Sequence, residues 1–447
     1  MPQTKPTSEQ VTFLAAGSGA SQRTVLDKLR DFVSVKDFGA VGNGVADDTA
    51  AFTAAIAAAG TRNVYVPGGS YKITGTVTGD CYSDSAVTIV TGTVNTVNRI
   101  GSSLSTTGNL VVGGDITVNG DGLFINPNAL INGDFQVAQR GTSITSTSVF
   151  VNSDDSYVLD RWYILSDGND AIDVTQNTAD APFAGGYCIA LDVETVNKKF
   201  GIAQIIEKQN CNGLLGQTVT LSFKAKVSST TKLDNVKCAI VAWSGTSDVV
   251  TSDIVSAWGV EGTNPTLIAN ATYENTPANL NVTTSWQKFT VTAAVDTASA
   301  SNIIVFIWSD VTDTTLGDFL YVTDVKLEAG TLATPYPREE FSTSILRCQR
   351  YFVSAISAAG LEWHDIGNVY TTYAAAGSGF FQRLLYRVPM RAAPTTTIVG
   401  TWAASNSNQP AATSAANTLT LSCVATAIGG AQTTATTNTG WYSSIEM

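Results

Sequence analysis

The sequence carries few charges, and their balance is of the wrong sign for binding nucleic acid. Only 14% of the 447 residues are charged, with 25 Lys and Arg against 37 Asp and Glu, which gives a net charge of −12. About a quarter of the residues are charged in a typical globular domain. No run of Lys and Arg interrupts this acidic background, whereas a phosphate backbone is bound through clustered basic side chains. The composition therefore argues against a nucleic-acid partner.

Histidine and closely spaced cysteine are also scarce. His364 is the only histidine, and the six cysteines are scattered without a CxxC pair. A structural zinc site needs four such ligands at short spacings, so we predict none. Isolated cysteines of this kind are typically buried small hydrophobes, which fits assembly in a reducing cytoplasm.

Targeting and membrane signals are lacking as well. The opening MPQTKPTSEQ has neither the basic nor the apolar region of a signal peptide. No apolar stretch approaches the ~20 residues of a membrane-spanning helix. We expect neither ordinary secretion nor membrane insertion.

The chain is rich instead in residues of strands and turns. Thr and Val suit a pleated, half-buried surface, and Gly, Asn and Ser suit the turns between strands. A chain of 447 residues is too long for one ordinary core. The composition therefore predicts several domains that are mostly β.

The most specific text lies near the N-terminus. The run VSVKDFGAVGNGVADDT at 33–49 is rich in glycine turns, and a predicted alanine-rich helix over 49–59 and the strand NVYVP follow it. These phrases resemble the opening of pectate-lyase-like β-helix tailspikes of bacteriophages, although Asn43 replaces a residue that is often acidic there. The text GSGASQRTVLDKL just upstream resembles the virion-proximal piece of such proteins. The resemblance implies a virion-binding anchor over 1–35 and a pectate-lyase-like segment over 36–78.

This β-helix-like segment is predicted to be truncated. Asp47 and Asp48 sit at a helix start, where acidic groups cap the helix, so we interpret them as structural rather than catalytic. The acids that do chemistry in β-helix enzymes come from later coils, which this chain lacks. The Thr/Gly/Val text over 79–125 indicates a thin shaft or linker, whose strands bury little within one chain. The resemblance implies a homotrimer, which the poor self-burial of this shaft supports, and the missing coils argue against enzyme activity.

From residue 126 onwards, apolar and polar residues alternate as they do in the strands of a two-layer sandwich. The phrases NGDF at 132–135, DRW at 160–162, LSFKAKV at 221–227 and VTDVKLEAG at 322–330 carry this pattern. Over 126–338 they resemble the jelly-roll, carbohydrate-binding-module-like domain of phage tail fibres. CQRYF at 348–352 and RVPMRAAP at 387–394 resemble recurring phrases of the regions that follow it. They imply a small β-rich receptor-binding tip over 339–447.

Tryptophans are the natural platforms for sugar rings. Trp162, Trp286 and Trp308 lie in alternating strands and are predicted to be core residues. Four others lie near turns or polar text and are predicted to be exposed. With the neighbouring His364, the candidate glycan-binding residues are Trp258, Trp363, Trp402 and Trp441.

Asp134 and Asp324 are placed by the sequence in the first and last strands of the sandwich. Related modules often hold a structural calcium ion near such positions, and carboxylate oxygens suit that cation. The alternative is a pair of hydrogen-bonded strand-end acids, and the sequence favours neither. Arg140 and Arg161 are interpreted as structural partners of acids or chain ends. No other cofactor is required.

The resemblance implies a phage tail fibre or tailspike subunit that is assembled in the host cytoplasm and works in the virion tail. Its N-terminus would dock to tail tube, adaptor or nozzle proteins. Its C-terminal part would attach the virion to surface glycan, lipopolysaccharide or an outer-membrane receptor. One alternative is a capsule or lipopolysaccharide depolymerase, which predicts two carboxylates facing one groove. The other is a structural adaptor, which predicts a tip without exposed aromatics.

Overall fold

Two compact units, Met1–Val112 and Gly113–Met447, divide the chain. The computed structural model describes residues 6–95 except 61, 80, 84 and 86, the pairs 117–118 and 121–122, and residues 127–356, 361–364, 369–371, 376–400, 403–404, 407–426, 433–436 and 440–447. Most of the predicted shaft and Trp402 therefore lie outside the described residues. Within them, no helix is both long and apolar enough to cross a membrane.

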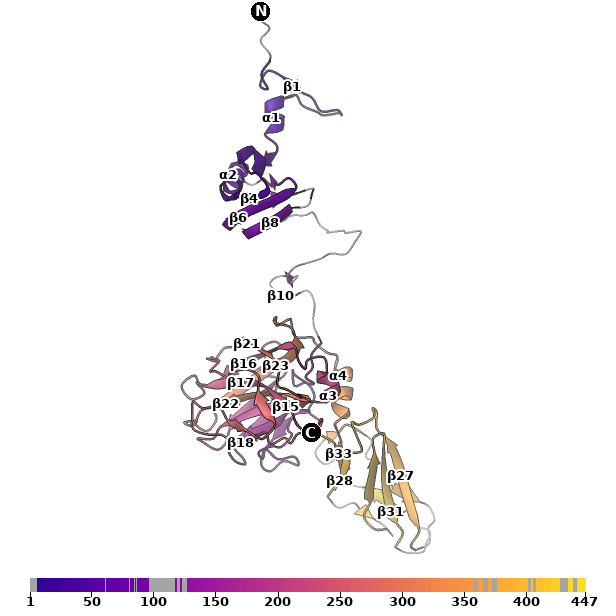
Figure 1. The fold of residues 1–447 in the computed structure, drawn as a ribbon. Helices are drawn as coiled ribbons and strands as arrows, with labels where there is room; N and C mark the ends of the chain where they lie inside the picture. The colour runs from indigo at the N-terminus through magenta and orange to yellow at the C-terminus, as the bar shows by residue number, and fades with distance from the viewer. Residues whose placement is uncertain are drawn as a thin grey trace, which may run out of the picture. The chain divides into compact units, whose positions relative to one another are not determined.

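Two parallel sheets, a short hairpin and two α-helices form most of the described part of the N-terminal unit (Figure 1). After the hairpin of β1 (Thr12–Phe13) and β2 (Arg23–Thr24) come α1 (Val25–Leu29) and the 3-10 helix η1 (Val35–Phe38). One parallel sheet holds β3 (Val33–Ser34), β5 (Val64–Tyr65) and β7 (Cys81–Tyr82). A second holds β4 (Asn43–Asp47), β6 (Gly69–Thr78) and β8 (Val87–Asn95). The parallel strands thus continue past residue 78, where a shaft was expected to begin.

Helix α2 spans Thr49–Ala59, the range predicted from its alanines and from Gly60. It buries Phe52 and Ala55 against Tyr71 of β6, and the rings of Phe52 and Tyr71 meet edge to face at 5.3 Å. Asp48 occupies the N-cap position, as predicted, but its side chain makes no capping bond; its carboxylate instead accepts hydrogen bonds from the backbone N–H groups of Val41 and Gly42. Asp48 therefore closes the glycine turn that leads into β4.

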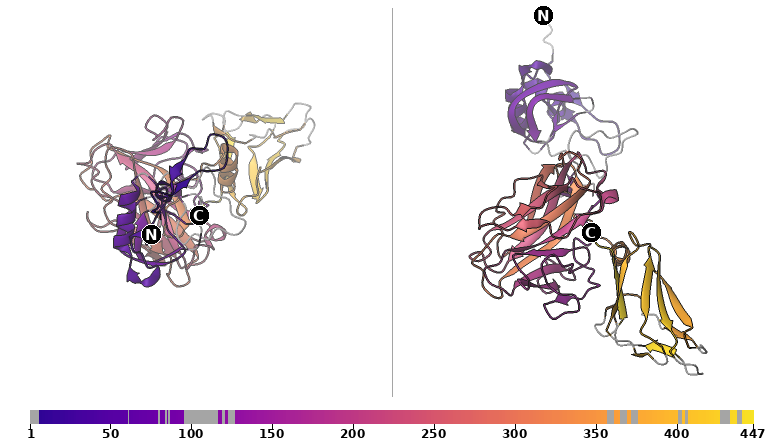
Figure 2. Two further views of the ribbon diagram at one scale, coloured as in Figure 1. Left: turned by 90° about the horizontal axis from the view of Figure 1, so that it is seen from above. Right: turned by 60° about the horizontal axis from the view of Figure 1, so that its bottom comes forward.

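A β-sandwich of two antiparallel sheets forms most of the second unit, as predicted (Figure 2). The six-stranded sheet has the order β11 (Ser143–Ile144), β13 (Ile172–Asn177), β14 (Cys188–Val193), β23 (Phe319–Ala329), β16 (Thr218–Val227) and β21 (Gln287–Ala294). The five-stranded sheet has the order β12 (Tyr163–Ser166), β15 (Phe200–Ile206), β22 (Asn302–Ser309), β17 (Val236–Trp243) and β20 (Ala271–Tyr273). Inward-facing residues of both sheets share one core, which includes the predicted Trp162.

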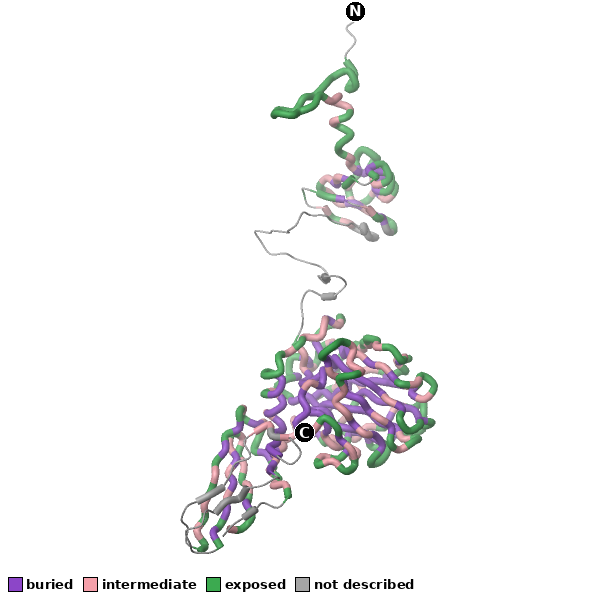
Figure 3. Tube along the Cα trace, turned by 180° about the vertical axis from the view of Figure 1, so that it is seen from behind, coloured by how far each residue is buried: buried purple, intermediate pink, exposed green. Residues whose placement is uncertain are grey.

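The outer face of the five-stranded sheet is also buried, and most of the trace inside the sandwich is coloured as buried in Figure 3. Phe306 and Trp308 stack on it at 4.5 Å, and residues of the segment 244–271, among them Ile254 and Trp258, pack over them. This segment carries β18 (Val255–Ala257) and β19 (Thr266–Leu267). Because of this cover, every residue of β22 is buried. The face is closed to a large ligand.

The C-terminal region begins with α4 (Phe341–Gln349) and continues in antiparallel sheets. One sheet has the order β25 (Leu361–Glu362), β24 (Phe352–Ile356), β33 (Gly440–Ser444) and β28 (Thr395–Val399). A second pairs β27 (Gly379–Leu385), β31 (Thr418–Val424) and β30 (Ala411–Ala415). A third pairs β26 (Val369–Thr371), β32 (Thr433–Thr436) and β29 (Ala403–Ala404). The first two share a core around Leu384, Leu421 and Trp441.

Candidate functional site

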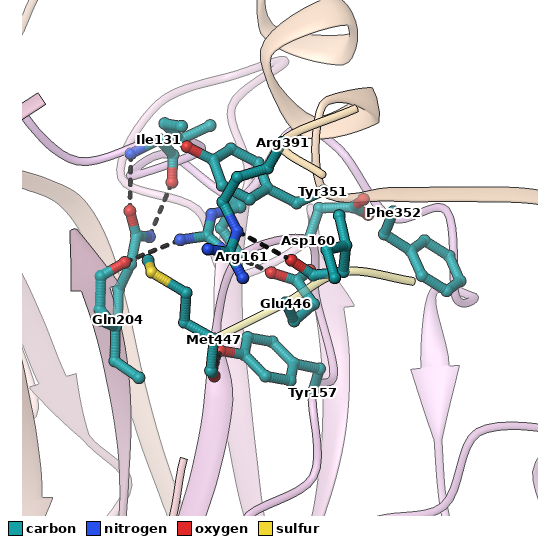
Figure 4. Close-up of polar contacts among 12 residues, drawn as sticks. Ile131, Tyr157, Asp160, Arg161, Gln204, Tyr351, Phe352, Arg391, Glu446 and Met447 are labelled. Carbon is teal, nitrogen blue, oxygen red and sulfur yellow. Dashed lines mark hydrogen bonds and ion pairs between the residues drawn. The ribbon is translucent and has the colours of Figure 1, made fainter. Parts of the chain in front are cut away.

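The most distinctive sequence motifs of the second unit meet in one buried junction between the sandwich and the C-terminal region (Figure 4). Glu446 follows β33 and lies against the sandwich, where its carboxylate pairs with the guanidinium groups of Arg140 and Arg161. All three side chains are at most 6% exposed. Tyr157 donates a hydrogen bond to the backbone carbonyl of Met447. Arg140 and Arg161 are therefore structural partners of acids, as predicted.

The CQRYF phrase completes this junction from the other side. Arg350 donates to Glu207 at 2.9 Å, and the Tyr351 hydroxyl donates to the same carboxylate at 2.7 Å. The Arg161 guanidinium lies 3.7 Å from the centre of the Tyr351 ring. The Arg140 guanidinium lies 3.6 Å from the centre of the Phe352 ring. These side chains hold two parts of the chain together.

Two of the candidate tryptophans are not exposed, contrary to prediction. Trp441 is fully buried because β33 is an inner strand, paired with β24 on one side and β28 on the other. Trp258 is 8% exposed because it packs on Phe306 beneath the cover of the five-stranded sheet. Neither can stack on a glycan without a rearrangement. Trp308 is buried as predicted, and Trp286 is partly buried.

Trp363 and His364 lie at the base of the C-terminal region. Trp363 is half-buried and packs against the cluster of Ile131, Ile345 and Tyr351. His364 contacts the backbone carbonyl of Leu385 through Nε2 at 2.9 Å. Its ring lies 5.5 Å from that of Trp441. This pair is therefore attached to the core of the C-terminal region.

Asp134 and Asp324 do come together, but with positive side chains rather than a metal-binding set. Asp324 pairs with Arg338 at 2.7 Å and with Lys224 at 3.0 Å, and Asp134 lies 3.7 Å from Arg338. Asp134 occupies a turn rather than a strand. Burial raises the pKa of Asp134, which works against a role as a charged ligand. No group of three or more His, Cys, Asp or Glu side chains that could hold a metal ion occurs in the described part of the chain.

A β-bulge in β23 sets the position of Asp324. Ser222 pairs with Lys326 and Lys224 with Thr323, so one extra residue of β23 lies between these pairs. Asp324 adopts the left-handed conformation, with φ 55°, as bulge residues do. The backbone N–H of Val325 then donates to the carbonyl of Gly133 at 2.8 Å. The bulge turns the Asp324 carboxylate outward between two cations.

An open pocket of about 260 Å³ lies at this bulge, on the outer face of the six-stranded sheet. Its lining combines positive side chains, hydroxyl groups and an aromatic ring, from strands β16, β21 and β23 and the segment after β23: Ser222, Phe223, Lys224, Lys288, Asp324, Thr334, Pro335, Tyr336 and Arg338. Thr334 fixes that segment, because its hydroxyl and N–H donate to buried Glu328 at 2.6 and 2.8 Å. The pocket walls are thus built on the sheet itself.

Aromatic side chains continue along the same face. Lys226 is two residues beyond Lys224 on β16 and pairs across the strands with Tyr321. Tyr321 stacks on Phe319 at 5.5 Å and meets Trp286 edge to face at 6.5 Å. The Lys226 ammonium lies 4.6 Å from the centre of the Tyr321 ring. The outer face of the six-stranded sheet therefore joins a cationic pocket to an aromatic cluster.

Sequence reasoning did not select these residues, although a signal was present. Lys224 and Lys226 alternate in FKAKV, and Lys288 occupies the matching strand text WQKF. Side chains two residues apart on a strand share a face. Two lysines with this spacing in a chain so poor in charge indicate a positive sheet face.

Comparison with known proteins supports the N-terminal resemblance in part. Residues 32–180 match the family model described as rhamnogalacturonase A/epimerase, pectate lyase-like. The mannuronan C5-epimerases AlgE5 and AlgE2 of Azotobacter vinelandii are each 52% identical to this chain over 59 residues. That region covers 12% of this chain and only 6% of either epimerase.

Similar solved structures include carbohydrate-binding modules and a phage tailspike domain. The TmCBM61 module in complex with β-1,4-galactotriose is 13% identical, with a TM-score of 0.24, and covers 46% of this chain and 99% of the module. The CBM22-1 xylan-binding domain of Paenibacillus barcinonensis Xyn10C is 10% identical, with a TM-score of 0.25, and covers 46% of this chain and 97% of that domain. The enzymatically active domain of bacteriophage CBA120 tailspike protein 4 is 14% identical, with a TM-score of 0.28, and covers 61% of this chain and 34% of that domain.

Proposed function

We propose that this chain is a subunit of a bacteriophage tail fibre or tailspike, and that it attaches the virion to a glycan on the host cell surface. The observation that carries the proposal is the pocket on the outer face of the six-stranded sheet, with its cations, hydroxyl groups and aromatic neighbours. Sugar recognition needs such a mixture of aromatic faces and convergent polar groups. The pectate-lyase-like match over residues 32–180 and the phage-type phrases support the class of protein.

We assign glycan binding to the sandwich rather than to the candidate tryptophans predicted from the sequence. Trp258 and Trp441 are buried, and the distinctive phrases are used in the junction. The five-stranded sheet is covered by its own segment 244–271. The outer face of the six-stranded sheet remains the best-equipped surface for a sugar.

The N-terminal segment is proposed to dock to tail proteins and to other copies of this chain. Helix α1 buries none of its residues, and several apolar side chains around it are exposed, namely Val11, Phe13, Leu14, Leu29 and Phe32. A two-stranded hairpin and a short helix are marginally stable alone. Partners in a virion tail, in a homotrimeric fibre, would cover this surface, and three copies would multiply weak binding by avidity.

A binding assay with two readouts tests the proposal. Full-length protein is mixed with host-cell envelopes and with isolated surface polysaccharide, and retained protein and released reducing sugar are scored together. We expect retention without sugar release, and loss of retention in Lys224→Gln/Lys288→Gln. Point substitutions are preferable to deletion of 339–447, because deletion would leave Arg140 and Arg161 buried without Glu446. Absence of retention on every envelope would overturn the proposal and favour a structural adaptor.

A depolymerase is the second candidate, and one observation favours it. Asp173 and Asp192 are cross-strand neighbours on the six-stranded sheet, and Asp192 is also opposite Phe319. Burial, with Glu194, Asp173 and Asp318 nearby, raises the pKa of Asp192 to about 6. Paired carboxylates, one of which has a raised pKa, are the groups that glycoside hydrolysis uses. Sugar release that is lost in Asp192→Asn would establish this alternative.

A further inference from the structure

The pocket at the β23 bulge has an excess of positive charge. Lys224, Lys288 and Arg338 line it, against Asp324 in the lining and Asp134 at 3.7 Å from Arg338, so the formal charge is +1 from three cations and two anions. The whole chain carries −12. A local positive site on such an acidic protein is not a consequence of overall composition.

The one carboxylate in the lining is already shared by two of these cations. Arg338 and Lys224 contact Asp324 at 2.7 and 3.0 Å. Lys288 instead donates to the backbone carbonyl of Ala333 at 3.2 Å. Within the described residues no carboxylate lies within ion-pairing distance of Lys288, so its charge is left for a ligand.

Arg338 is 44% exposed at its side chain, but its guanidinium is oriented by its neighbours. Its guanidinium lies 4.4 Å from the centre of the Phe183 ring and 5.0 Å from that of Tyr336. Asp324 fixes the same group from below. A guanidinium oriented in this way presents its remaining N–H groups as a fixed donor pair, which suits a planar carboxylate or a phosphate.

Resting on the proposed glycan-binding function, we infer that this pocket selects an acidic glycan by binding the negatively charged group of one sugar unit. Lys288 and Lys224 supply positive charge, and Arg338 supplies oriented N–H donors. Ser222 and Thr334 also line the pocket. The volume of about 260 Å³ fits a single sugar unit, since pockets for larger ligands are typically ~300–1,000 Å³. The neighbouring rings of Trp286 and Phe319, both only partly buried, are placed to contact the next unit of the polymer.

The overall charge of the chain makes this a short-range interaction. A net charge of −12 repels a polyanion at long distance, so the pocket cannot increase the rate of encounter. Affinity then depends on direct contacts and falls as salt screens them. Modest affinity for each chain, increased by several copies, is the expected regime.

Binding of the full-length chain to defined polymers tests the inference. Polygalacturonate offers carboxylates, its fully methyl-esterified form offers the same backbone without charge, and a phosphorylated mannan offers phosphate. We expect the charged polymers to bind, and added salt to weaken binding. Lys224→Gln/Lys288→Gln should lower affinity about tenfold or more, because the loss of even one charge-assisted hydrogen bond costs about that factor.

The matched control is Lys208→Gln/Lys232→Gln, which changes net charge equally at sandwich lysines outside the pocket lining. It should change affinity less than twofold. Equal losses in both variants, equal binding of the esterified polymer, or no binding of either charged polymer would overturn the inference. Binding of one charged polymer alone would support it and identify carboxylate or phosphate as the group. If host envelopes retain the protein equally well with and without Lys224 and Lys288, the inference fails but the proposed function stands. If the charged polymers bind but host envelopes do not retain the protein, the inference stands but the proposed function fails.

Discussion

Replacing Glu446 by Gln should destabilise the protein strongly, because it removes the negative charge between two buried arginines. Arg140 and Arg161 are 3% and 1% exposed at their side chains, so water cannot solvate their charges in the absence of Glu446. Breaking a buried ion pair by removing one partner costs about 3–5 kcal/mol. Domains of this size lose about 2–4 °C in Tm per kcal/mol, so we expect a drop of about 6–20 °C.

The assay is urea and thermal unfolding of the full-length chain, followed by tryptophan fluorescence and limited proteolysis. Glu340→Gln is the matched control, because Glu340 is exposed and its side chain makes no capping bond at α4. It should lie within about 0.5 kcal/mol of the wild type. In a double-mutant cycle, Arg161→Gln and Glu446→Gln should couple by more than about 1 kcal/mol. The reasoning fails if Glu446→Gln unfolds at the same urea concentration as Glu340→Gln.

Three further substitutions test other parts of the chain. Gly440→Ala should lower the free energy of unfolding by about 2–3 kcal/mol, because a Cβ there would lie 1.7 Å from the carbonyl oxygen of Ala355. Gly213→Ala is the control, because a Cβ at Gly213 meets open space and the change should be neutral. Equal urea midpoints for the two variants would refute this prediction. Asp310→Asn should cost about 3–5 kcal/mol in the same assay, because it leaves the buried Lys199 and Lys237 without their shared carboxylate, and a change below 1 kcal/mol would contradict it. The raised pKa of Asp192, about 6, means that the folded state binds its proton more tightly than the unfolded state, so stability should fall as pH rises from about 4 to 6. Asp192→Asn should make the free energy of unfolding depend less on pH between about 4 and 6. The change should be smaller than the full ~1.4 kcal/mol per pKa unit, because the side chain is partly solvated. An unchanged pH dependence would exclude Asp192 as its source.

Local patterns predicted the elements that depend on local sequence. The alanine run and Gly60 gave the bounds of α2, and alternation located β16 and β22 within the sandwich. The parallel pairing after the VSVKDFGAVGNG run follows the family resemblance. These features are set within about ten residues, which is the range over which periodicity and caps act.

Features that depend on distant pairing could not be predicted in this way. The polar text around Trp441 suggests exposure, but β33 is inserted between β24 and β28, and nothing nearby in sequence indicates those partners. The cationic pocket likewise needs β16, β21 and the segment after β23 to come together. The motifs that contain Arg161 and Tyr351 could be recognised in the sequence. That they come together near Glu446 could be seen only in the structure.

The ion pair between Arg161 and Glu446 joins residues separated by 285 positions in the chain. During synthesis, therefore, the sandwich acquires both arginines long before it acquires the acid that neutralises them. Contacts of such long range form late and slow the folding of the parts that need them. A chain that stops before residue 446 keeps two positive charges in what should be a dry interface. The junction thus makes full stability of the sandwich depend on a chain that extends through residue 446, so that truncated products are left as substrates for chaperones and proteases.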